Sequence, residues 1–376
     1  MPHEFPPLPE RKILPEALPE TTAEHLSQAR LICQAGDYAT ILQEFSLPEN
    51  TALWEEQRTR VKKEGEAHTL RDATLSLHEH DWEMLTILEL FDRSTYEHCL
   101  RTYAIAKQKI ESRGEVGAYL RQKIAKEGLT PWDIEHACLL HDIGKIALTP
   151  KDLILNNTLT NEEWHELFAE LCHSAQGGHE TLATYEETLA TRPELREKDL
   201  TPLRVALTEE QATALQKNGI NVSLPLGDII AKHQDISVAI VGRYYKNTTL
   251  LELIGNHHEK PLSFRETRPI AQSAVRVASL IDTLRLADVF DAFHSARPYK
   301  KGEGIFSTLA LLSDRAQTGF VDEYLVFLWI KDELTHFDSH SYLHTLKARR
   351  SDSFENEQAS HKKITRFLAS FYQEAA

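Results

Sequence analysis

Hydrophobic residues recur along most of the chain at the three- and four-residue spacing of amphipathic helices. Between residues 21 and 50 this spacing predicts two short helices, separated at Gly36. A long charged helix is predicted from about Leu53, and residues 84–113 are predicted to form one or two more. The pattern therefore predicts an all-α chain.

The C-terminal half continues the helical pattern, and one of its apolar stripes ends in carboxylates. A long helix is predicted over residues 268–293, and its inward face carries Leu280, Leu284, Ala287, Asp288 and Asp291. The apolar residues 305–330 are predicted to close the domain. A polar linker and one last helix are predicted for residues 331–376.

Composition narrows the classes of function. The net charge of -15 argues against binding of a nucleic-acid polymer, which needs clustered Lys and Arg, but leaves room for one small phosphate ligand. No apolar run reaches the roughly 18 residues of a membrane helix, and Met1–Lys12 lacks a signal-peptide core. The four cysteines show no CxxC spacing, which indicates a reducing compartment without disulfides or a thiolate zinc site. We therefore expect a cytoplasmic chain that binds no membrane.

The segment His141-Asp142-Ile143-Gly144-Lys145 follows a helix whose first residues carry clear signals. Thr130-Pro131-Trp132-Asp133 provides a cap, a proline in the first turn and an acid three residues after the cap. The histidine and aspartate are predicted to lie in the last turn, with Gly144 as the stop. An imidazole and a carboxylate behind the apolar run Ala137–Leu140 indicate a divalent metal. The alternative is a buried, hydrogen-bonded histidine beside a surface aspartate.

Other segments carry residues of the same chemistry, namely His98, the doublet His257-His258, Asp288 with Asp291, and the turn Arg297-Pro298-Tyr299-Lys300. Each has a plainer explanation by itself: a core histidine, an exposed helix end or a solvated basic patch. Adjacent helical residues diverge by about 100°, so the two histidines of the doublet could reach two different metals. Asp291 is expected to support the site or cap a helix.

Taken in this order, the segments resemble the HD-GYP branch of the HD-domain metal-dependent phosphohydrolases, over about residues 90–330. The resemblance implies an HD-domain helical bundle with two divalent metal ions. Imidazole and carboxylate donors favour iron or manganese over magnesium. In the implied site one metal is held by His98, His141 and Asp288, the other by His233, His257 and His258, and Asp142 bridges both.

Two positions of the family pattern need a choice in this chain. The segment around His233 resembles the family's next histidine-bearing helix, while His173 and His179 are alternatives. Choosing His233 implies an insertion at roughly 180–225, a stretch bounded by prolines. Some relatives hold a third metal through a glutamate one turn before the first histidine, but Ser94 occupies that position here, so two metals are expected.

The resemblance also implies an activity, the hydrolysis of cyclic di-GMP. Asp142 and Lys145 would be the catalytic residues, and Lys145, Arg297 and Lys300 would contact the phosphates. The family's loop Asp-Gly-x-Gly-Tyr-Pro is replaced here by residues 260–266, which contain no glycine. The alternatives are a catalytically weak signalling or binding module and an HD-domain nucleotide phosphohydrolase with another substrate.

The expected organisation follows from these assignments. It comprises a flexible Pro-rich arm (1–20), an N-terminal helical region (21–83), the HD-GYP-like catalytic domain (84–330) and a C-terminal helical tail (331–376). Residues 21–80 are expected to serve packing first, and regulation or dimer formation second. The expected partners are a cyclic dinucleotide and, beyond it, a second copy of the chain or a signalling protein.

Overall fold

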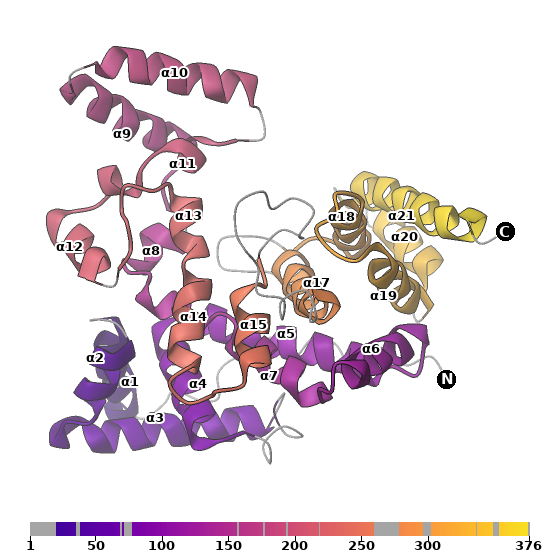
Figure 1. Ribbon diagram of the computed structural model, residues 1–376, viewed down its shortest axis with the longest axis horizontal. Helices are drawn as coiled ribbons and strands as arrows, with labels where there is room; N and C mark the ends of the chain where they lie inside the picture. Colours follow the sequence, from indigo (N-terminus) through magenta and orange to yellow (C-terminus); the bar gives the residue numbers. More distant parts are fainter. Residues whose placement is uncertain are drawn as a thin grey trace.

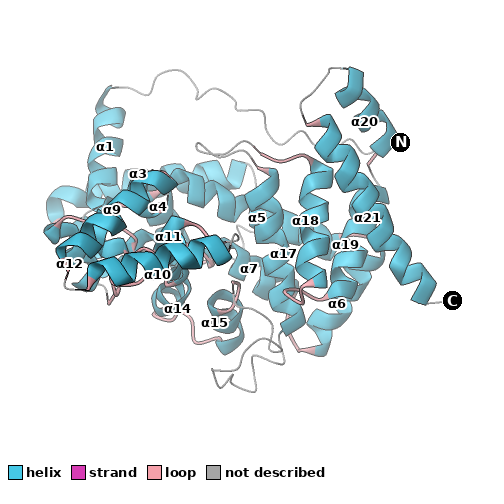
Figure 2. Cartoon of the chain, turned by 90° about the horizontal axis from the view of Figure 1, so that it is seen from above, coloured by secondary structure: helices cyan, strands magenta, loops and turns pink. Residues whose placement is uncertain are grey.

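The computed structural model describes residues 20–34, 38–67, 70, 77–155, 158–175, 177–192, 195–217, 219–258, 278–295, 302–335, 337–348 and 353–374. Apart from one isolated β-bridge between Pro202 and Pro225, the regular elements in these ranges are helices (Figures 1 and 2). The prediction of an all-α fold is therefore confirmed. The predicted Pro-rich arm lies outside the described residues, except for Glu20. Within the described ranges, every helix is too short or too polar to cross a lipid bilayer.

In chain order, the elements are α1 (Glu20–Gln34), α2 (Tyr38–Phe45), α3 (Pro48–Ala67), α4 (Glu79–Phe91), α5 (Arg93–Glu111), α6 (Glu115–Lys126), α7 (Pro131–Leu140), the 3-10 helix η1 (Ile143–Ala147), α8 (Lys151–Ile154), α9 (Asn161–Ser174), α10 (Gly178–Thr191), α11 (Glu197–Leu200), the 3-10 helix η2 (Leu203–Ala206), α12 (Glu209–Lys217), α13 (Leu226–Ala231), α14 (His233–Val241), α15 (Thr248–Gly255), α17 (Ala278–His294), α18 (Ile305–Gln317), α19 (Glu323–Thr335), α20 (Ser339–Ala348) and α21 (Phe354–Glu374).

One large apolar core extends from the N-terminal helices to the C-terminal ones. It includes Ala29 of α1, Trp82 of α4 and Ile364 of α21, all of which are buried. In its middle, α5 packs against α7 and α17, and α14 packs against η1. The helices α1–α3 and α18–α21 lie at opposite ends of this body (Figures 1 and 2).

Two of the domain boundaries expected from the sequence fall inside helices that belong to the main core. Helix α4 runs across the expected boundary at residues 83 and 84, and α19 runs across the one at 330 and 331. The regions on both sides of the expected catalytic domain bury apolar side chains in the same core as that domain. The amino-acid composition changes at the expected boundaries, but the packing is continuous across them. Residues 147–155 contain the end of η1 and the short helix α8.

Helices α9–α12 project from the main body (Figure 1). They have small cores of their own, in which Phe168 of α9 packs with Tyr185 of α10, and Trp164 of α9 packs with Leu203. The projecting part therefore includes α9 and begins before the insertion expected at 180–225. The aromatic residues of α9 explain the difference, because they pack against the segment that was expected to be inserted.

Glu357 of α21 holds the first turn of α18. Its buried carboxylate accepts hydrogen bonds from the backbone N–H groups of Phe306 (3.1 Å) and Ser307 (2.9 Å) and from the hydroxyl of Tyr342 (3.2 Å). These N–H groups have no partner within their own helix. The C-terminal helix is thus tied to the main body by a helix cap that comes from a distant part of the chain.

We expect Glu357→Ala to lower the free energy of unfolding by about 2 kcal/mol, because it leaves the buried N–H groups of α18 without an acceptor. Urea unfolding followed by circular dichroism measures the change. Glu355→Ala is the matched control, since Glu355 lies on the same helix but is exposed. Equal stability of the two variants would show that the cap contributes nothing.

Candidate metal centre

Local sequence places His141 and Asp142 directly after α7. The Thr130 backbone N–H and hydroxyl both donate to the Asp133 carboxylate (2.8 and 2.7 Å), so the predicted capping box is confirmed. The helix ends at Leu140, so His141 is its C-cap residue and Asp142 follows it. Gly144 lies within η1 and does not stop α7, contrary to the prediction.

The His141 ring is held so that one nitrogen faces the interior of the cluster. Its Nδ1 lies 2.9 Å from the carbonyl oxygen of Cys138, so Nδ1 carries the hydrogen and Nε2 carries a lone pair. Nε2 is fully buried and has no hydrogen-bond partner among the described residues. Burial lowers the pKa of His141, which keeps the ring neutral. A buried lone pair without a donor is a position suited to a cation.

The Asp142 carboxylate lies at the centre of five side chains. Oδ1 is 3.0 Å from His233 Nε2 and 3.9 Å from His257 Nε2. Oδ2 is 2.6 Å from Lys145 Nζ, 3.5 Å from His141 Nε2 and 3.7 Å from His98 Nε2. Burial opposes ionisation, but the nearby Lys145 and histidines overcome it and hold the Asp142 pKa well below its usual value. The group is therefore an ionised carboxylate with a histidine on each side.

Helix α17 contributes two aspartates that flank His98 of α5. Asp288 Oδ1 lies 2.9 Å from His98 Nε2, and Asp291 Oδ2 lies 2.6 Å from His98 Nδ1. Arg101, one turn after His98, donates from Nε to Asp291 Oδ1 at 2.6 Å. Burial disfavours charge on His98, but the two carboxylates outweigh it and raise the pKa of the ring. Asp291 thus fixes the orientation of His98, the supporting role expected for it.

His233 and His257 face each other at the other side of Asp142. Nδ1 of each ring lies 2.5–2.6 Å from the carbonyl oxygen three residues earlier, so Nδ1 carries the hydrogen in the neutral ring. The two Nε2 atoms are only 3.2 Å apart, beside Asp142 Oδ1. Two lone pairs and a carboxylate oxygen in such proximity repel one another, and a bound cation would relieve that repulsion.

His258 completes this side of the cluster. Its Nδ1 lies 3.8 Å from Asp288 Oδ2, and its ring centroid is 4.1 Å from that of His257. Desolvation at the site lowers the pKa of His258 to about 4, although 42% of its side chain is exposed, and burial holds the pKa of His257 well below its usual value. Both rings are therefore neutral near pH 7, which is the form that binds metals.

The donor atoms form compact groups that could hold a metal ion. Within one group all ligand atoms lie within 4.8 Å of one another, and the two larger groups are Asp142, His233, His257 and His258, and His98, His141 and Asp288. The division matches the one that the family resemblance implies, while the number and identity of the ions stay predictions. A third group joins Cys99 with His141 and Asp142, and burial raises the pKa of the Cys99 thiol well above its usual value.

The geometry of the His257-His258 doublet differs from the prediction. Helix α15 ends at Gly255, so the doublet lies in the turn that follows the helix. Both rings belong to the same group of donors instead of reaching two separate metals. The helical divergence of about 100° does not apply beyond the helix end.

The alternative histidines lie elsewhere. His173 is at the end of α9 and His179 is in α10, and their rings contact each other at 5.1 Å between centroids. We expect His233→Ala to lose at least one bound metal ion per chain and His173→Ala to lose none. Metal counting by plasma mass spectrometry after loading and desalting measures both. Full metal content in His233→Ala would exclude His233 as a ligand.

Some predicted residues cannot be compared with the structure, and others were missed. Arg297, Lys300 and residues 260–266 lie outside the described residues. Ser237 of α14 was missed: its hydroxyl donates to the His141 carbonyl oxygen (2.7 Å) and accepts from the Gly144 N–H (2.8 Å). No local sequence signal marks a contact between such distant segments.

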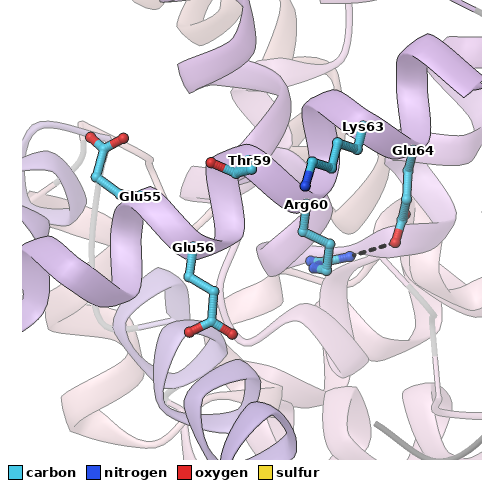
Figure 3. Close-up of a pocket in the computed structure, with 6 residues that line it drawn as sticks. All are labelled: Glu55, Glu56, Thr59, Arg60, Lys63 and Glu64. Atoms are coloured by element: carbon cyan, nitrogen blue, oxygen red, sulfur yellow. Dashed lines mark hydrogen bonds and ion pairs between the residues drawn. The ribbon is translucent and has the colours of Figure 1, made fainter.

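A surface pocket elsewhere offers no comparable chemistry. It runs along α3 and is lined by Glu55, Glu56, Thr59, Arg60, Lys63 and Glu64 (Figure 3). All six residues come from one helix, and Arg60 already pairs with Glu64 and with the buried Glu89. Neither candidate group of metal ligands contributes to this pocket.

Comparison of the chain with protein-family models, with curated proteins and with solved structures gave no match.

Proposed function

We propose that the chain is a phosphodiesterase that uses two divalent metal ions to hydrolyse a cyclic dinucleotide, with cyclic di-GMP as the first candidate. The observation that carries the proposal is the arrangement around Asp142. Three helices and two turns bring histidine lone pairs and ionised carboxylates together in a cluster that is buried except for His258. The Nε2 atoms of His233 and His257 lie 3.2 Å apart, and Nε2 of His141 has no hydrogen-bond partner among the described residues.

The donor set fits iron or manganese. His98, His141 and Asp288 would hold one ion, His233, His257 and His258 the other, and Asp142 would lie between them. Two such ions supply Lewis acidity, which lowers the pKa of water and neutralises charge on phosphate oxygens. The resemblance of the linear sequence to the HD-GYP branch supports the same assignment.

The chain's own residues have distinct tasks in this proposal. Asp291, held by Arg101, fixes the His98 ring. Asp142 stays ionised because Lys145 and the surrounding histidines favour its charged form. The Lys145 ammonium, 2.6 Å from Asp142 Oδ2 and only partly buried, would donate a hydrogen bond to a non-bridging phosphate oxygen and stabilise its charge in the transition state.

The test is hydrolysis of cyclic di-GMP by purified protein loaded with manganese or iron, with release of the linear dinucleotide or GMP measured by chromatography. Metal content is measured on the same sample. No hydrolysis with the metals bound would instead favour the signalling or binding module, as the glycine-free segment 260–266 would suggest. Activity on mononucleotides alone would favour a nucleotide phosphohydrolase.

We expect Lys145→Ala to retain bound metal but to lose about a hundredfold to a thousandfold in kcat, because one donor to the transition state is removed. Steady-state kinetics and metal counting on the same preparation separate the two effects. Lys151→Ala is the control, since this nearby lysine pairs with Asp92 instead of the cluster. A wild-type kcat in Lys145→Ala would remove Lys145 from the mechanism.

A further inference from the structure

A buried arginine holds the turn that carries the histidine doublet. Arg285 lies on α17, one turn before Asp288, and is 5% exposed. Its guanidinium donates to the carbonyl oxygens of Asn256 (2.7 Å) and His257 (3.3 Å). Both acceptors belong to the turn after α15. One side chain therefore connects the helix of Asp288 to the backbone of the doublet.

The arginine is itself fixed from two sides. Its NH1 donates to Asp282 Oδ1 at 2.9 Å, and the other oxygen of Asp282 accepts the backbone N–H of Asp322 at 2.8 Å. The guanidinium also lies 5.5 Å from the centre of the Phe320 ring, at cation–π distance. These contacts leave the planar fork in one orientation, aimed at the end of α15.

The hydrogen bonds from Arg285 stabilise the C-terminal end of α15. The last carbonyl groups of α15 lack partners within the helix, and a positive charge near a helix C-terminus is favourable. His257 Nδ1 satisfies the Ile254 carbonyl, and Asn256 Nδ2 satisfies that of Glu252. Arg285 binds the carbonyl groups of Asn256 and His257, which follow the helix end. The turn 256–258 is therefore held by its own side chains, Asn256 and His257, and by Arg285 of α17.

We propose that Arg285 is a positioning residue that sets the distance between the two candidate metal sites. Asp288 belongs to one site, His257 and His258 belong to the other, and Arg285 ties the backbone that bears the second pair to the helix that bears Asp288. The metal part of this inference rests on the proposed function, whereas the fixing of the turn does not. A lysine cannot replace the arginine, because it lacks the planar fork that binds two carbonyl groups and a carboxylate together.

The first test uses metal-free protein. Hydrogen–deuterium exchange of a peptide covering residues 250–258 should rise at least tenfold in Arg285→Lys, while exchange in α5 and α7 stays unchanged. The double variant Asp282→Asn/Arg285→Met removes the buried charge pair as a whole, so it avoids an unpaired carboxylate and should show the same local effect. Arg315→Lys is the control, since Arg315 also lies on Phe320 (5.1 Å) but is exposed. Wild-type exchange in a folded Arg285 variant overturns the inference.

The second test measures manganese binding by calorimetry. In Arg285→Lys we expect one of two dissociation constants to rise by about tenfold to a hundredfold and the other to change little, as for other residues that orient a metal ligand. The exchange coupling between two manganese ions, read by electron paramagnetic resonance, should change as well. Two unchanged constants, or equal weakening of both, would overturn the positioning role. If the wild-type chain bound no metal, the proposed function would fail, and the exchange experiment would still decide whether Arg285 holds the turn.

Discussion

Asp142→Ala is expected to lose both bound metal ions and to lower cyclic dinucleotide hydrolysis by more than about a thousandfold. The reason is the position of the carboxylate, whose Oδ1 lies toward His233 and His257 and whose Oδ2 lies toward His98 and His141. Metal counting after desalting and the hydrolysis assay measure the two losses independently.

Two companion variants make the Asp142 result specific. Asp142→Asn preserves size but removes the charge, so retention of metal with loss of rate would indicate that the side chain binds without bridging. Asp235→Ala is the matched control, because Asp235 is an exposed aspartate of α14 that pairs only with the neighbouring Lys232 in the described contacts. An Asp142→Ala protein with full metal and full rate would refute the whole assignment.

The fold class and the local helix signals could be predicted because they depend on short-range chemistry. The capping box at Thr130 involves residues three positions apart, and it is present. Domain boundaries depend instead on which helices share a core. Trp82 and Ile364 both contribute to the main core, although they lie on either side of the expected catalytic domain. Composition alone does not report such packing.

In the candidate site, too, short-range features could be predicted from the sequence, whereas contacts between distant segments could not. The sequence indicated which residue types would converge, and His233 was preferred over His173 because its surroundings resemble a family segment; the structure brings His233 to Asp142. The conformation of the doublet was predicted wrongly, because the predicted helix was continued past Gly255 and Asn256, residues that commonly end helices. The support from Ser237 and Arg285 was missed, since each acts on residues far away in the sequence.

Gly144 explains how closely two of these distant segments approach. A Cβ atom at this position would lie 2.1 Å from the His233 carbonyl oxygen and 2.6 Å from the Ser237 backbone nitrogen. Both are backbone atoms of α14, so no side-chain rotation could make room. The absence of a side chain at Gly144 therefore allows η1 to contact the first turn of α14, which places His233 beside Asp142.

We expect Gly144→Ala to lower the free energy of unfolding by at least about 2 kcal/mol and to release the metal ion bound by His233, because α14 must move away from η1. Urea unfolding of the metal-free protein and metal counting after loading measure the two effects. Gly227→Ala is the matched control, since its nearest neighbour would be the Asp199 carboxylate at 3.9 Å, and it should be neutral or stabilise α13 by up to about 1 kcal/mol. Wild-type stability with full metal content in Gly144→Ala would show that the position of His233 does not depend on this contact.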